Sequence, residues 1–340
     1  MKRKLVLFIT LLFMVGLLAA CGENTAEDVV DSLNKKAEEM QSFKATADMV
    51  IETGEEPQQF DVQVWHQKDD YYKVVLQNEL DEKGNQVILR NDEGVFVLTP
   101  SINKSYKFQN DWPKHHSQPY LFTSLVSDIA NDADREFKST ENFYEFTVKT
   151  NYKGNQQLPY QKIYFHKKTY EPAHVRVLNS QNETMVKVDF TEFEFNPEIK
   201  EGEFDTEQNL AEGTVSVPTV AELEEQSMAV YYPTNLPGGV EFTNEKVVST
   251  DNGERSILTY DGDKHFKLVQ EMYTNSHPTS VDVPVYAEGE MVNLGFTVGH
   301  LTNNSLEWQQ DGMRFVLASD SLTVEEMVEV AKSVQGQAMK

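Results

Sequence analysis

Much of this chain alternates apolar and polar residues with a period of two, and that pattern restricts the fold more than any other feature. Phe60, Val62 and Val64 alternate with Asp61 and Gln63. Similar runs recur along the chain, separated by turn sequences such as residues 91–94 and 167–172. Alternation places the apolar side chains on one face of a strand. The sequence therefore predicts a mainly β fold of antiparallel strands with one buried face.

Two amphipathic segments interrupt the strands and predict helices. Thr25 and Asp28 form a capping-box pattern before the first, and Pro119 suits the first position of the second. Apolar residues recur at helical spacing in both segments. We expect both helices to cover the sheet like lids, through Val29, Leu33, Leu121, Leu125 and Ile129.

Seven to ten antiparallel strands with two inserted helices predict one strongly curved sheet, an unclosed barrel whose concave side the helices cap. A slip in the alternation near Thr191 predicts a β-bulge. The concave side is either filled by a plain core or left open as an apolar cavity. The residues predicted to line it are Phe60, Val62, Val64, Tyr72, Val74, Leu76, Val87, Leu89, Phe165, Val186, Val188 and Phe190.

A change in composition divides the chain into two predicted domains. Residues 205–227 contain no aromatic residue and are rich in acid, which is typical of a linker. The half-barrel would then span residues 26–204. Residues 228–337 predict a smaller α+β domain, with alternating strands and a final helix capped by Thr323 and Glu326.

The N-terminus carries the pattern of a bacterial lipoprotein signal peptide. A basic start precedes a short apolar run that ends in Leu18-Ala19-Ala20-Cys21. We expect residues 1–20 to be removed, Cys21 to be acylated and residues 21–25 to form a tether. The alternatives are an ordinary secretory signal with an incidental cysteine, or an uncleaved anchor helix.

Lipidation of Cys21 would place the protein on the outer, extracytoplasmic face of the cell membrane. Two or three acyl chains, such as palmitate, make a durable anchor where a single chain would be marginal. Cys21 is the only cysteine. An intrachain disulfide is therefore impossible, and the exported domains must be held together by packing alone.

The formal net charge of −25 excludes nucleic acid as a partner. A phosphate backbone requires a basic binding face. Removal of Lys2, Arg3 and Lys4 with the signal peptide makes the charge more negative still.

No pattern in the sequence predicts catalysis, a cofactor or a metal centre. The motifs G-x-S-x-G and H-E-x-x-H and a phosphate-binding glycine loop are all absent from the sequence. His166 and His174 flank one hairpin, but zinc needs three or four converging ligands. We therefore expect a protein that is not an enzyme.

Two stretches resemble the LolA-type lipoprotein carriers. They are IYFHKKTYEPAHVRVLN and VDFTEFEFNPEIKEGEF, in which Phe165, Pro172, Asn196, Ile199 and Phe204 occupy the family's positions. The resemblance covers residues 26–204 and implies an unclosed barrel with a helical lid and an apolar cavity for lipoprotein acyl chains. The carriers tend to have an arginine that latches the lid where this chain has Lys73, and lysine lacks the bidentate fork.

With its lipoprotein signal, the chain is also similar to the YdcC-type sporulation lipoproteins and to germination lipoproteins of the GerS kind. This similarity implies a role in sporulation or in regulating cortex-processing enzymes by contact. The C-terminal region resembles an envelope domain of unknown function, through Trp308, Gly312, Phe315, Glu326 and Ala331.

Two hypotheses for function follow. In the first, the half-barrel binds an apolar group, either an acyl chain of a lipid or lipoprotein or a hydrophobic protein segment. In the second, the protein is a scaffold or regulator that docks a cell-wall or spore-cortex enzyme through its surface, with its interior fully packed.

Overall fold

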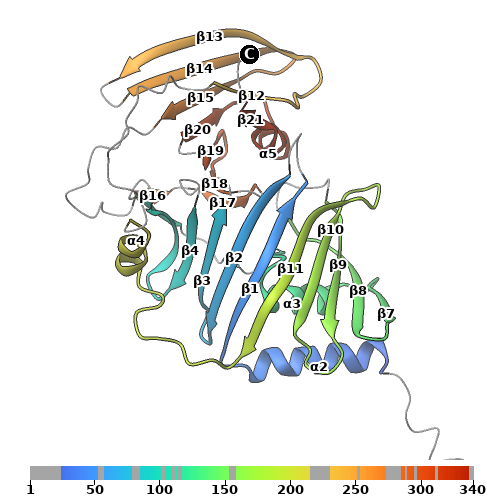
Figure 1. Cartoon of the computed structure of the whole chain (residues 1–340). Helices are drawn as coiled ribbons and strands as arrows, with labels where there is room; N and C mark the ends of the chain where they lie inside the picture. Colours follow the sequence, from blue (N-terminus) through green and yellow to red (C-terminus); the bar gives the residue numbers. More distant parts are fainter. Residues whose placement is uncertain are drawn as a thin grey trace, which may run out of the picture.

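The computed structural model describes residues 24–52, 57–78, 85–100, 104–108, 112–113, 117–152, 158–214, 230–250, 253–272, 285–287, 289–294, 297–310 and 313–336. Their fold is mostly β, with two large sheets and few helices, as the sequence predicts (Figure 1). Cys21 lies outside the described residues. None of the helices described is long and apolar enough to cross a membrane.

The first sheet is an unclosed, curved layer of twelve strands in the order β16-β6-β5-β4-β3-β2-β1-β11-β10-β9-β8-β7. Its strands are β1 (Ser42–Ile51), β2 (Gln58–Gln67), β3 (Tyr71–Asn78), β4 (Gln86–Asn91), β5 (Gly94–Thr99), β6 (Lys104–Phe108), β7 (Glu136–Ser139), β8 (Phe143–Lys149), β9 (Tyr160–His166), β10 (Pro172–Leu178), β11 (Thr184–Phe195) and β16 (Val285–Ala287). All neighbouring pairs are antiparallel except β16 and β6. The predicted curved antiparallel sheet is thus confirmed.

The predicted bulge lies where the alternation slips. On β11, Glu192 pairs with Thr46 and Phe190 pairs with Ala47, so Thr191 is the extra residue. The insertion restores Phe193 and Phe195 to the side of the sheet that carries the core, where both pack.

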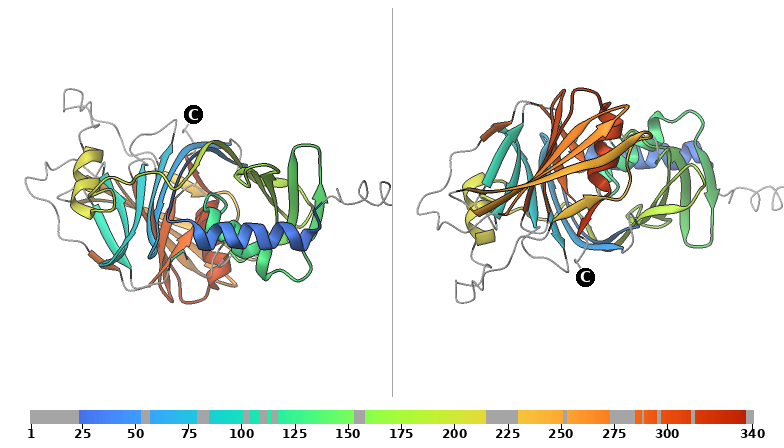
Figure 2. Two further views of the ribbon diagram at one scale, coloured as in Figure 1. Left: turned by 90° about the horizontal axis from the view of Figure 1, so that it is seen from below. Right: turned by 90° about the horizontal axis from the view of Figure 1, so that it is seen from above.

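Helices α2 (Ala26–Glu39) and α3 (Phe122–Asn131) cover the concave side of this sheet (Figures 1 and 2). Thr25 caps α2 in the predicted capping box with Asp28. The predicted lid residues Val29, Leu33, Leu121, Leu125 and Ile129 are all buried in the core. Helix α3 begins later than predicted: Pro119 lies in a turn closed by a bond from the Leu121 amide to the Gln118 carbonyl, 3.2 Å long.

Asn196 fixes α2 against the sheet. It adopts a positive φ of 58° directly after β11, a conformation that asparagine tolerates better than most residues. Its side-chain oxygen accepts a hydrogen bond of 2.7 Å from the backbone amide of Gln41, between α2 and β1. The position matched to the LolA-type carriers therefore has a structural role here.

The second sheet has seven strands in the order β13-β14-β15-β20-β19-β18-β17. They are β13 (Val240–Thr250), β14 (Gly253–Gly262), β15 (Phe266–Met272), β17 (Glu290–Asn293), β18 (Val298–Leu301), β19 (Ser305–Gln310) and β20 (Met313–Ala318). Helix α5 (Val324–Lys332) packs on it, with the predicted capping box of Thr323 and Glu326. Strands β12 (Tyr231–Pro233) and β21 (Val334–Gly336) pair beside it.

The two sheets are joined by contacts as well as by the chain. Strand β16 belongs to the C-terminal half but pairs with β6 of the first sheet. The side-chain oxygen of Gln86 accepts a hydrogen bond of 2.9 Å from the Val298 amide, and the Tyr106 hydroxyl donates to Glu307 at 3.3 Å. Part of the predicted linker is helical, since α4 (Thr206–Thr214) packs on the first sheet through Leu210.

Candidate functional site

Most residues predicted to line an apolar cavity lie in one packed core. Those in the main core are Phe60, Val62, Val64, Tyr72, Val74, Leu76, Phe165, Val186 and Val188, all buried. Phe190 is half-buried and packs against them.

Val87 and Leu89 lie elsewhere. They form a second cluster with Phe96, Leu98 and Leu210, beneath α4. Ile88, which lies between them in β4, belongs to the main core. Because neighbouring residues in a strand point to opposite faces, β4 is apolar on both sides of the sheet, and Val87 and Leu89 do not share a face with Ile88.

Helix α3 fills the concave side with its apolar face. The ring of Phe122 is fully buried, and its centroid lies 6.2 Å from that of Phe165 and 5.2 Å from that of Phe195. Phe43 and Phe193 complete this aromatic cluster at 6.4 and 5.7 Å from Phe122. The side chains in this region contact one another as in an ordinary protein core.

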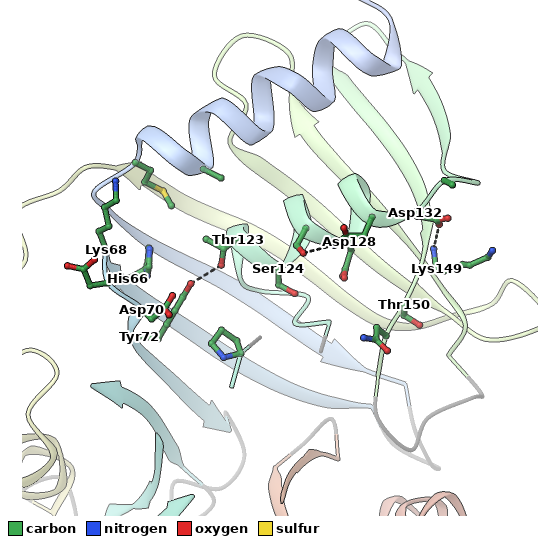
Figure 3. Close-up of a pocket in the computed structure, with 18 of the residues that line it drawn as sticks. His66, Lys68, Asp70, Tyr72, Thr123, Ser124, Asp128, Asp132, Lys149 and Thr150 are labelled. Carbon is green, nitrogen blue, oxygen red and sulfur yellow. Dashed lines mark hydrogen bonds between the residues drawn. The ribbon is translucent and has the colours of Figure 1, made fainter. Parts of the chain in front are cut away.

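A pocket with a volume of about 750 Å³ lies on the other side of α3, and most of the residues that line it are polar or charged, although apolar atoms also contribute to its surface (Figure 3). The helix contributes Thr123, Ser124, Ser127, Asp128 and Asn131. We call this hollow the α3 pocket. Thr123, Ser127 and Asn131 are spaced by four, so they form one row along the helix, whereas Phe122, Leu125 and Ile129 point into the core.

The other walls come from five separate parts of the chain. Ala37 and Met40 come from the end of α2, and Lys149, Thr150 and Asn151 from the end of β8. The remaining lining residues are His66, Lys68, Asp69, Asp70, Tyr72, Pro113, Asp132, Ala133 and Asp134. Of the residues predicted to line a cavity, Tyr72 is the one found here.

Two stacked aromatic rings, those of His66 and Tyr72, form one end of the pocket. His66 lies 4.3 Å from the ring centroid of Tyr72, and the Tyr72 hydroxyl is 3.0 Å from that of Thr123 (Figure 3). His66 Nδ1 lies 2.9 Å from the carbonyl oxygen of Tyr71 and donates to it, because a carbonyl can only accept. Burial lowers the pKa of His66, which favours the neutral ring.

Asp128 lies in the middle of the pocket wall. Its Oδ2 accepts a hydrogen bond of 2.6 Å from Gln161 Nε2, and the Ser117 side chain also bonds to the carboxylate. Burial raises the pKa of Asp128 to about 6 despite these two bonds. Within the described ranges, no lysine or arginine forms an ion pair with it.

At the far end of the pocket, two aspartates of the loop after α3 contact Lys149 at the end of β8. Asp132 accepts hydrogen bonds from the backbone amides of Lys149, at 2.7 Å, and of Asp134, at 3.0 Å. Lys149 Nζ in turn lies 2.6 Å from Asp134 Oδ2. These bonds join the end of α3 to the end of β8 and define the shape of the pocket.

The described part of the chain holds no group of three or more histidine, cysteine, aspartate or glutamate side chains placed to bind a metal ion. His174 is bonded to Asp189, with 2.6 Å between Nδ1 and Oδ1. Lys73, at the family's latch position, pairs with Glu203 at 2.7 Å and lies over the ring of Trp65. Its neighbours Tyr72 and Val74 point into the core, so Lys73 faces away from α3.

Sequence comparison connects the whole chain to proteins of sporulation. Residues 2–204 match a family described as "Sporulation protein YdcC-like". The "Sporulation protein YdcC" of Bacillus subtilis strain 168 is 47% identical over 339 residues, which cover 100% of this chain and 99% of that protein. These matches confirm the resemblance to the YdcC-type proteins.

Three solved structures match the chain at lower sequence identity. The crystal structure of MucB is 18% identical and covers 93% of this chain and 100% of that one, with a TM-score of 0.36. A LolA superfamily protein from Nitrosomonas europaea is 10% identical, covering 53% and 98%, with a TM-score of 0.30. A chain from the complex of the CwlD amidase from Clostridioides difficile with the GerS lipoprotein is 14% identical. The match covers 52% of this chain and 98% of that one, with a TM-score of 0.24. On the family match and the full-length relative, the chain belongs to the YdcC-like family of sporulation proteins.

Proposed function

We propose that this chain is a non-enzymatic docking protein, held on the outer face of the cell membrane of the sporulating cell by a lipid on Cys21. Its partner would be a second protein of the envelope, which it binds through the α3 pocket. The predicted uptake of an acyl chain is the competing function.

The packing of α3 carries this proposal. An acyl chain would need an open apolar chamber. The concave side of the sheet instead holds the ring of Phe122 packed against those of Phe165 and Phe195, with Leu125 and Ile129 fully buried in the same core. Most residues that line the α3 pocket carry polar or charged groups, which supports a partner that can form hydrogen bonds there, while Ala37, Met40 and Pro113 allow apolar contact as well.

The place of the anchor also fits a docking role. Helix α2 begins at Ala26, five residues after Cys21. A tether of that length reaches at most about 17 Å. In Figure 1, α2 lies across the end of the first sheet that is farther from the second sheet. A lipid on Cys21 would therefore hold α2, and the α3 pocket beside it, near the bilayer, with the second sheet pointing outward.

Site-specific photocrosslinking in sporulating cells tests the docking function. A photoreactive amino acid at Asn131, on the rim of the pocket, should give one crosslinked protein species. The same amino acid at Val247, exposed on β13, serves as the matched control and should not give that species. Identical products from both positions would contradict docking at the pocket.

A binding measurement on the purified chain tests the competing function. The mature chain with Cys21→Ser should not take up a fluorescent fatty acid at micromolar concentration, because the rings around Phe122 occupy the concave side. Stoichiometric uptake, together with no crosslink at Asn131, would replace docking with acyl-chain binding. The anchor has its own test, since Cys21→Ser should move the protein from the membrane fraction to the soluble fraction.

A further inference from the structure

The charges around the α3 pocket are unequal. Five aspartates line it, Asp69, Asp70, Asp128, Asp132 and Asp134, against the two lysines Lys68 and Lys149. Asp134 is paired with Lys149 at 2.6 Å, and Asp70 with Arg90 at 3.6 Å. His66 adds no formal charge in its neutral form. The pocket therefore presents an excess of negative charge, as does the whole chain at −25.

Asp128 differs from the other aspartates because it is largely buried. It has hydrogen bonds from Gln161 and Ser117, but no basic partner in the described part of the chain. A buried charge without an opposite charge is costly, and such carboxylates are normally paired. A cation brought by a ligand would provide the pair.

Fully buried polar side chains lie behind Asp128, and one of them holds its carboxylate in place. Gln161, with no exposed surface, donates from its Nε2 to Asp128, while its Oε1 has no hydrogen-bond partner among the described residues. The same holds for Oε1 of Gln118, which is 4% exposed and bonded through its backbone to Ser124 of the pocket wall. Buried acceptors are nearly always satisfied in folded proteins. Neither glutamine lines the pocket itself, so the acceptor that a ligand meets at this point of the wall is the Asp128 carboxylate, which suits a group rich in donors.

The row of polar residues on α3 limits the shape of the ligand. The helix has ten residues and is thus about 15 Å long. An extended peptide rises about 3.3 Å per residue, so four or five residues would span the row. The hydroxyl and amide groups of Thr123, Ser127 and Asn131 can bond to the backbone of such a segment.

We infer that the α3 pocket binds an extended segment of the partner protein and places one lysine or arginine side chain of that segment against Asp128. This inference rests on the docking function proposed above and adds the chemistry of the partner. An ammonium brings three donors and a guanidinium five, which match the acceptors of Asp128 and its neighbours. The acidic body of the protein also attracts a basic segment from a distance.

Direct binding of a defined peptide tests the inference. Cys21 is the only cysteine, so the mature chain with Cys21→Ser and Asn131→Cys can carry one environment-sensitive dye at the pocket rim. The probe is acetyl-Ser-Lys-Thr-Arg-Ser-Gly-amide. Its neutral control has norleucine for lysine and citrulline for arginine. The basic peptide should shift the dye emission with saturation, and the neutral peptide should bind at least about tenfold more weakly.

Variants of two aspartates locate the effect. Asp128→Asn keeps the size and the acceptor oxygen but removes the charge, and it should weaken the basic peptide about tenfold or more while leaving the neutral peptide unchanged. Asp48→Asn removes an exposed charge on β1 that is not part of the pocket lining, so it should change binding less than twofold. Equal losses in both variants would overturn the assignment to Asp128 in favour of a general charge effect.

The two proposals fail in different ways. A crosslink at Asn131 in cells with no preference for the basic peptide would overturn the inference and leave the docking function standing. Specific binding of the basic peptide with no crosslink in cells would support the pocket chemistry and contradict docking. n-Butylamine carries an ammonium group but no peptide backbone. If it competes as well as the peptide at equal concentration, the inference that the pocket binds an extended segment would be refuted.

Discussion

Replacing Asp128 by asparagine should stabilise the protein at neutral pH. Burial raises the pKa of Asp128 from 3.8 to about 6, about two units. One unit corresponds to about 1.4 kcal/mol, so the ionised carboxylate costs the folded state about 3 kcal/mol. Asparagine keeps an acceptor for Gln161 Nε2 and carries no charge to bury.

The sign of the pH dependence follows from the raised pKa. Between pH 3.8 and 6 the folded protein binds more protons at Asp128 than the unfolded chain does, so the free energy of unfolding falls as the pH rises through this window. The advantage of Asp128→Asn should therefore grow from about 0.5 kcal/mol at pH 4 to about 3 kcal/mol at pH 8. Tyr152, whose pKa is raised by burial and by the charge of Asp128, does not titrate in this range.

Urea unfolding of the mature chain with Cys21→Ser, with and without Asp128→Asn, at several values of pH, measures this difference. Asp134→Asn is the matched control. The ion pair with Lys149 lowers the pKa of Asp134, so this variant should show no gain that grows with pH. An Asp128→Asn variant that is less stable than its parent at pH 8 would refute the reasoning, because the carboxylate would then be stabilised by charge in the free protein.

Three further substitutions test the packing and the caps. Phe122→Ala should cost about 3–5 kcal/mol in urea unfolding, since the ring is fully buried, and a cost below about 1 kcal/mol would contradict a filled concave side. Leu210→Ala should lower the free energy of unfolding by about 2–5 kcal/mol, or else release α4 and speed hydrogen exchange in β4 and β5. If stability and exchange are both unchanged, α4 does not pack on these strands. Thr323→Ala should cost about 1 kcal/mol through loss of the α5 cap, whereas Thr323→Ser should restore it.

The strands that the sequence predicts best are those with large apolar residues on one face. Strand β1 has the same alternation, with Phe43, Ala45, Ala47 and Met49 buried, and it lies at the centre of the sheet. We do not predict it from the sequence, because alanine and methionine are weak strand formers. The bulge at Thr191 is predicted, because the slip falls between large residues that must stay on one side.

The α3 pocket could not be predicted, for a different reason. Thr123, Ser127 and Asn131 on a helix suggest a face turned to solvent, and nothing local indicates that β2 and β8 end beside them. Strand β4 presents a different difficulty, because its apolar residues do not alternate with polar ones. Val87, Ile88 and Leu89 are all apolar, which is typical of a strand buried on both faces, and only the position of α4 explains why.

The pairing of β16 with β6 has a consequence for how the chain would reach its final form if it is exported as proposed. Val285 pairs with Tyr106, far earlier in the sequence. If export runs from the N-terminus, β6 reaches the outside long before the residues that will protect its backbone groups. Until then it is an exposed edge to which another chain could add a strand. The edge of the first sheet is therefore covered only after the C-terminal half of the chain has followed it across the membrane.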